Sequence, residues 1–173
     1  MFHGWDNFYF LLGSAAAGLI GLLFVVVTLT AGFDHAQASR GAKLYMTPTA
    51  LHFAAVLSVS AVALAPALPI GATAAIFALI GLLGAANAVR ASVGIATPRP
   101  ETPAAHWSDF WMYGIVPAAI YLALCGVAGA LAMRAEWAVD ALAALLLSLL
   151  LVGIRNAWDL VTWIAPKANS GPS

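Results

Sequence analysis

Polar residues interrupt the most apolar part of this chain, close to its C-terminal end. The run from Ala138 to Ile154 carries two polar side chains and leads directly into Arg155, Asn156 and Asp159. An arginine or aspartate in the centre of a membrane helix costs about 2.5–3.5 kcal/mol, so such residues are rare and commonly serve binding or transport. These three residues are therefore the first candidates for a functional polar site.

Helical spacing groups four polar residues on one stripe, at intervals of seven, four and three: Ser148, Arg155, Asp159 and Thr162. Arg155 and Asp159 lie one turn apart and can form an ion pair. In one interpretation, Arg155 reaches the headgroups with Asp159 as its partner. In the other, the stripe faces inward and lines a polar cavity. The first is favoured because Arg155 lies near the end of its apolar segment.

The composition determines which elements must position these residues. Of the 173 residues, 63% are hydrophobic and 8% are charged, whereas about 25% of a soluble domain is charged. This composition predicts an integral membrane protein whose main partner is the lipid bilayer. Seven basic residues balance seven acidic ones, so no basic face for nucleic acid is expected.

Five apolar segments approach the roughly 20 residues that a membrane helix needs, at about residues 8–31, 48–65, 70–91, 109–133 and 138–165. They predict an all-α bundle of five transmembrane helices in a single membrane domain, residues 1–173. Pro66 and Pro69 argue against merging the second and third segments into one span. The first segment is too long for a signal peptide and is expected to be retained.

The basic residues predict the orientation, because Lys and Arg concentrate in cytoplasmic loops. With five spans, one side holds Arg134 and the other holds Arg40, Lys43, Arg90, Arg99 and Lys167. We therefore expect the N-terminus outside and the C-terminus in the cytoplasm.

This topology brings further polar residues to the cytoplasmic ends of the helices. The predicted polar site contains His52, Asn87, Arg90, Asp109, Arg155, Asn156 and Asp159. Some of these have ordinary roles as well. His52 is expected to be a neutral hydrogen-bond partner of a neighbouring helix, and Asp109 to favour the N-terminal end of its own helix.

Catalytic and metal-binding patterns are missing from the sequence. The four histidines do not have ligand spacing, so no metal site and no cofactor are expected. No P-loop, GxSxG or HExxH sequence occurs, and the protein is not expected to be an enzyme. The weakest of the hypotheses is an enzyme that acts on an amphiphile with His52 and Asp159 as acid and base.

Small residues four apart let membrane helices approach closely, and the predicted packing positions are Ser14, Gly18, Gly21, Gly81, Gly84 and Gly126. Packing within the chain is the favoured interpretation. The alternative is that one such face, most plausibly on the first helix, contacts another copy of the protein. Pro117 is expected to kink the fourth span and to leave the Tyr113 carbonyl free for a partner.

Three segments together resemble a family of small bacterial multi-pass inner-membrane proteins of unknown function. They are residues 18–29, 45–53 and the run Gly-Ile-Arg-Asn-Ala-Trp-Asp-Leu-Val-Thr-Trp at 153–163. The resemblance implies the inner (cytoplasmic) membrane of a bacterium and brings no activity with it. The sequence therefore predicts an oligomeric or accessory membrane module. The alternative is a small oligomeric channel or transporter in which the polar site forms a cytoplasmic vestibule.

Overall fold

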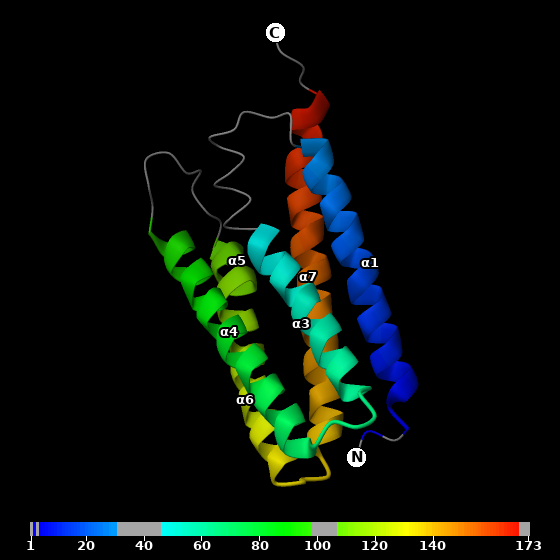
Figure 1. Cartoon of the computed structure of the whole chain (residues 1–173). Coiled ribbons are helices and arrows are strands. Elements are labelled where there is room, and N and C mark those ends of the chain that lie inside the picture. Colours follow the sequence, from blue (N-terminus) through cyan, green and yellow to red (C-terminus); the bar gives the residue numbers. More distant parts are fainter. Residues whose placement is uncertain (1, 3, 31–45, 98–106, 170–173) are drawn as a thin grey trace.

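A computed structural model gives the fold of residues 2, 4–30, 46–97 and 107–169, with side chains placed up to Thr28 in the first helix and Thr162 in the last. In this part of the chain every regular element is a helix, and the long helices run roughly side by side (Figure 1). The elements are α1 (Asp6–Thr30), α3 (Thr47–Ala63), α4 (Ile70–Ala96), α5 (Trp107–Asp109), the π-helix η2 (Phe110–Ile115), α6 (Val116–Ala132) and α7 (Ala138–Asn169). The predicted all-α class is confirmed.

Four helical segments of the described chain are long and apolar enough to cross a membrane: Asp6–Thr28, Ile70–Ala96, Trp107–Ala132 and Ala138–Thr162. The apolar helix α3 has 17 residues and so measures about 26 Å at a rise of about 1.5 Å per residue. The hydrocarbon core of a bilayer is about 30 Å thick. By length, α3 is therefore the marginal member of the bundle.

The break between α3 and α4 lies where the prolines indicate. The helix α3 ends at Ala63, and Pro69 is extended, with φ −61° and ψ 141°, directly before α4. At the start of α3, Thr47 is the first helical residue, and Met46 before it already has α-helical backbone angles. A proline in the first turn lacks only an N–H that would have no helical partner anyway, so Pro48 is tolerated there.

The turn from α6 to α7 has the hydrogen bonds of a Schellman motif. The N–H of Ala135 donates to the Ala130 carbonyl, and that of Arg134 donates to Leu131. Arg134 takes the left-handed conformation, with φ 60°, that glycine usually adopts at this position. The last carbonyls of α6 are thereby satisfied, and α7 starts three residues later at Ala138.

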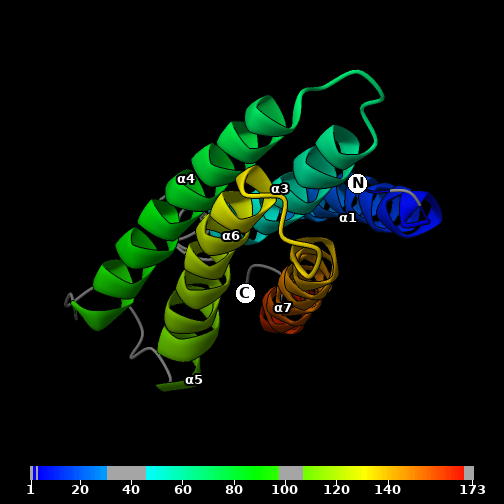
Figure 2. The same ribbon diagram turned by 90° about the horizontal axis from the view of Figure 1, so that it is seen from below.

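Viewed along the helix axes, α4 and α6 form one pair, α1 lies on the opposite side, and α3 and α7 lie between them (Figure 2). The core is largely aliphatic, with four fully buried aromatic side chains, Tyr9, Phe53, Phe77 and Tyr121. The Tyr9 hydroxyl donates to the Val139 carbonyl at 3.2 Å and ties the start of α1 to the start of α7. The helices α3 and α7 therefore lie between α1 and the α4–α6 pair, and both contact α1.

Glycines allow close contact between α4 and α6. A Cβ on Gly81 would lie 2.5 Å from the Cys125 sulfur and 2.9 Å from the Tyr121 carbonyl oxygen. A Cβ on Gly84 would overlap the Tyr121 ring. Real Cβ atoms essentially never come that close to another heavy atom, so both positions require glycine as long as α6 keeps its place.

The favoured interpretation of the other four packing positions is wrong. Ser14, Gly18, Gly21 and Gly126 are exposed in the single chain, and a Cβ on any of the three glycines would meet no atom within 4 Å. For the three positions on α1 the reason is the rotation of that helix, which turns Leu12, Gly13 and Ala16 inward instead. On α6, Val127 and Ala128 face inward in place of Gly126. Gly13 is the close contact, because its Cβ would lie 3.1 Å from the Ser60 Cβ of α3.

Candidate functional site

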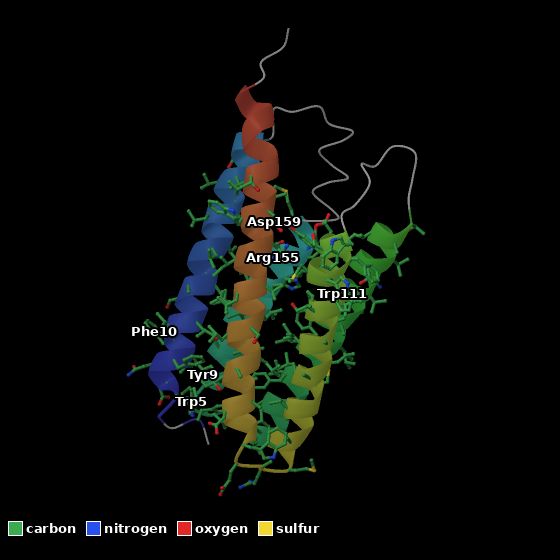
Figure 3. All side chains as sticks on the ribbon, turned by 180° about the vertical axis from the view of Figure 1, so that it is seen from behind. Trp5, Tyr9, Phe10, Trp111, Arg155 and Asp159 are labelled. Carbon is green, nitrogen blue, oxygen red and sulfur yellow. The ribbon has the colours of Figure 1, made fainter. Side chains whose placement is uncertain are left out.

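The polar stripe of α7 lies along one flank of that helix. Arg155 Nη1 is 3.2 Å from Asp159 Oδ2, and both side chains are half-exposed, at 38% and 40% (Figure 3). Ser148 and Thr162 are exposed, and their hydroxyls donate to carbonyls of α7 itself. The predicted pairing of Arg155 with Asp159 is present. The stripe does not point into the core of the chain.

Asn156 is different, because it is completely buried. Its amide nitrogen donates to the Met112 carbonyl at 3.2 Å, and its own backbone carbonyl accepts from the Tyr113 hydroxyl at 3.0 Å. Arg155 Nη1 is 3.4 Å from its side-chain oxygen. Asn156 therefore joins α7 to η2 from both its side chain and its backbone.

The π-helix explains why the Met112 carbonyl lacks a backbone donor. The N–H of Val116 donates to the Trp111 carbonyl, five residues back, instead of four as in an α-helix. In that register Met112 would need the N–H of residue 117, which is Pro117 and has none. The Asn156 amide takes the place of this missing donor. The sequence predicted a free carbonyl before Pro117 but placed it at Tyr113, one residue too late.

His52 belongs to a second, separate group. It is completely buried on α3, and its Nδ1 lies 3.0 Å from the Tyr121 hydroxyl of α6. Because Gly84 leaves room for the Tyr121 ring, the glycine on α4 indirectly positions this hydrogen bond. Within the described chain, no hydrogen bond joins His52 to Asp159, as the acid–base hypothesis would require in the absence of a shared cavity.

Among the described residues, no hydrogen bond or ion pair links the remaining predicted site residues to these groups. The Asn87 side-chain nitrogen is buried and has no hydrogen-bond partner in the described residues. Arg90 is exposed on α4. Asp109 lies in the short helix α5, where its carboxylate oxygen is 3.4 Å from the Ser108 hydroxyl. The described helix ends are not joined into one polar site by hydrogen bonds or ion pairs.

Sequence reasoning missed the groups that complete these contacts. Tyr113 and Tyr121 each supply a hydroxyl to a buried partner, and their spacing of eight residues, close to two helical turns, was the available signal. Gly153 was also missed. A Cβ there would lie 2.6 Å from the Phe53 ring, so this glycine lets α3 approach α7.

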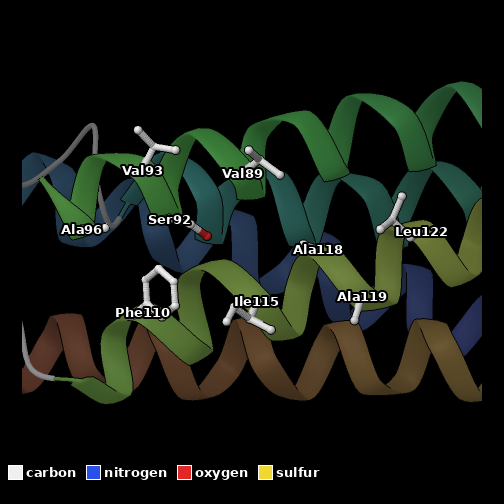
Figure 4. Close-up of a pocket in the computed structure, with 9 residues that line it drawn as sticks. All are labelled: Val89, Ser92, Val93, Ala96, Phe110, Ile115, Ala118, Ala119 and Leu122. Atoms are coloured by element: carbon white, nitrogen blue, oxygen red, sulfur yellow. The ribbon is translucent and has the colours of Figure 1, made fainter.

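An apolar groove runs between α4 and the η2–α6 segment, with a volume of about 550 Å³ (Figure 4). Val89, Val93 and Ala96 line one wall, and Phe110, Ile115 and Leu122 line the other. Ala118 and Ala119 also line the groove. Ser92 also borders the groove, but its hydroxyl donates to the Ala88 carbonyl of its own helix at 3.0 Å. The groove can therefore bind an apolar group.

Titratable side chains do not gather into a metal centre in the described ranges, where no group of three or more His, Cys, Asp or Glu residues has suitable geometry. Comparison with protein-family models, with curated proteins and with solved structures finds no match to this chain.

Proposed function

We propose that this protein is a non-catalytic membrane module that crosses the bilayer five times and self-associates through the open face of α1. The open face consists of Ser14, Ala17, Gly18 and Gly21, all exposed in the single chain. We place the protein in the bacterial inner membrane, with its N-terminus outside and its C-terminus in the cytoplasm. The resemblance of three segments supports the membrane, and the distribution of basic residues supports the orientation.

The fifth span is α3. Its 17 residues lie at the lower limit of the range that can cross a bilayer, about 17–25. It is flanked by α1, α4 and α7, and His52 and Thr49 near its start are fully buried. A crossing helix enclosed by other helices has little contact with lipid, so its short length is tolerated.

The observation that carries the proposed self-association is the unfilled space over α1. Gly18 and Gly21 have no atom within 4 Å of a Cβ position. Glycine inside a helix is destabilising by about 0.5–1 kcal/mol relative to alanine. On α4 the same cost is offset by contact with α6, whereas on α1 no contact with a described residue offsets it.

The degree of burial points to the same helix. In the 18-residue apolar stretch of each span, 22% of α1 is buried, compared with 39% of α4 and 44% of the spans that contain α6 and α7. Small residues on an exposed membrane helix allow two backbones to approach closely, with packing energy in place of a hydrophobic force. A two-fold symmetric contact would bring the same face of α1 together from two copies.

The polar groups support a structural role more than a catalytic or channel role. Asn156, His52 and Tyr113 are used in bonds between helices. Arg155 and Asp159 neutralise each other on the flank of α7. The alternative of a polar vestibule gains no support from the groove, whose walls are apolar.

Disulfide cross-linking in native membranes tests the self-association. The variant Gly18→Cys, made in a Cys125→Ala background, should give a covalent dimer under mild oxidation. Gly126→Cys is the matched control, because Gly126 is an equally open glycine on α6, and it should remain monomeric. The proposal fails if Gly18→Cys gives no more dimer than Gly126→Cys.

A further inference from the structure

The apolar groove between α4 and the η2–α6 segment matches one leaflet of a bilayer in length. Phe110 and Leu122 on one wall are twelve residues apart, at most about 18 Å along an α-helix. Val89 and Ala96 on the other wall are seven residues apart, about 10 Å. Half of a hydrocarbon core of about 30 Å is about 15 Å. The groove therefore extends from one membrane interface to about the middle of the bilayer.

One end of the groove has the side chains of an interface. Trp107 and Trp111 are exposed beside Phe110, and Ser108 and Asp109 precede it in the chain. Tryptophans collect at the headgroup level of membranes. The end at Phe110 therefore lies at the headgroups, and the end at Leu122 lies among the acyl chains.

A basic residue lies close to the same groove. Arg90 is exposed on α4, three residues before Val93 of the groove wall, and residues at this spacing are neighbours on a helix surface. In the described part of the chain Arg90 has no ion-pair partner. An arginine at this depth can extend toward the interface while its stem stays in apolar surroundings.

From the length, the apolar walls and this charge, we infer that the groove binds one phospholipid: an acyl chain fills it, and an anionic headgroup pairs with Arg90. The inference rests on the proposed membrane insertion, but not on self-association through α1.

Native mass spectrometry of the full-length protein tests the inference, after release from vesicles of equal amounts of phosphatidylglycerol and phosphatidylcholine. The wild type should retain one lipid per chain, with phosphatidylglycerol favoured about fivefold, the ratio expected for one basic residue near an anionic lipid. Ala119→Trp should fill the groove and abolish retention. Ala144→Trp, at an exposed alanine of α7, should retain the lipid. Arg90→Gln should retain one lipid without headgroup preference.

Several results would overturn the inference. Equal lipid retention by Ala119→Trp and the wild type, or no retention by the wild type, would show that no lipid occupies the groove. A wild-type dimer that Ala119→Trp dissociates would assign the groove to a second copy. Unchanged preference in Arg90→Gln would remove the headgroup contact. Should Ala119→Trp fail to reach the membrane, Ala119→Leu allows the same comparison.

Alkaline carbonate extraction of the wild type separates this inference from the proposed function. If the protein is extracted, membrane insertion fails, and the lipid site fails with it. If the protein stays in the membrane but retains no lipid, only the lipid site fails. The cross-linking result at Gly18 does not depend on the lipid site.

Discussion

Two glycine-containing faces of this bundle have similar sequences and opposite surroundings. On α4, Gly81 and Gly84 touch α6 so closely that a Cβ would overlap its atoms. On α1, a Cβ on Gly18 or Gly21 would meet no described residue within 4 Å. Spacing of small residues therefore identifies faces that can approach another helix closely. It does not say whether that helix belongs to the same chain.

Polar residues of α7 show the same difference between inner and outer faces. Asn156 is buried and bonds to η2, whereas Ser148, two turns earlier, is exposed and bonds to its own helix. Buried polar groups without a partner are costly in an apolar environment. The inner polar group should therefore affect stability far more than the outer one.

The largest expected loss of stability is at the α4 face that contains Gly81 and Gly84. Gly84→Leu forces a side chain into the Tyr121 ring, and overpacking costs about 1–3 kcal/mol or more where a neighbour cannot move. Displacing Tyr121 also breaks its bond to His52. We expect a clear loss of stability in thermal unfolding of the purified protein. Gly21→Leu is the control and should not destabilise the monomeric protein, because its side chain meets no described neighbour and leucine is the better helix former. Equal stability of the two variants would contradict the proposed difference between the α4 and α1 faces.

A smaller effect is expected at Asn156. Asn156→Ala leaves the Met112 carbonyl without a donor, and an unpaired buried carbonyl costs about 1–3 kcal/mol. Ser148→Ala is the control and should change the free energy of unfolding by less than about 0.5 kcal/mol, as exposed substitutions usually do.

A double-mutant cycle sharpens this second prediction. Pro117→Ala restores an N–H at the position where the π-helix lacks one. In that background Asn156→Ala should cost less than it does alone, because the backbone can supply the donor. Costs that simply add would contradict the assigned role of Asn156 as a replacement for the Pro117 N–H.

The smallest effect is expected at the outer ion pair. Arg155 and Asp159 are each more than one-third exposed, and pairs of this kind contribute about 0.3–0.5 kcal/mol at helix spacing. Arg155→Gln should therefore shift the unfolding midpoint very little. A loss as large as that of Asn156→Ala would contradict this ranking and would point to the contact between Arg155 and the buried Asn156 side chain.

Much of the fold follows from local sequence signals, and less of the site does. Long apolar runs and the prolines at 66 and 69 place the helices and one of their breaks, because both act within a few residues. The rotation of each helix depends on distant partners. Gly13 faces α3 and Gly18 faces outward because of the fit to Ser60 and its neighbours, which spacing along one helix does not contain.

The polar site illustrates the same limit. The pairing of Arg155 with Asp159 could be predicted because it is local to one turn. The bond from Asn156 to Met112 spans 44 positions and depends on a π-helix that Pro117 alone does not specify. Grouping polar residues by membrane depth placed His52 with Asn156, yet their hydrogen-bond partners lie on different segments, Tyr121 of α6 and Met112 of η2.

The most direct test of self-association through α1 is to count subunits by single-molecule photobleaching of the labelled protein in lipid bilayers. The wild type should bleach in two or more steps. Gly18→Leu, which blocks the open face without touching the core, should bleach in one step, while Gly126→Leu should behave like the wild type. A single step for the wild type, or the same number of steps for Gly18→Leu, would contradict the account.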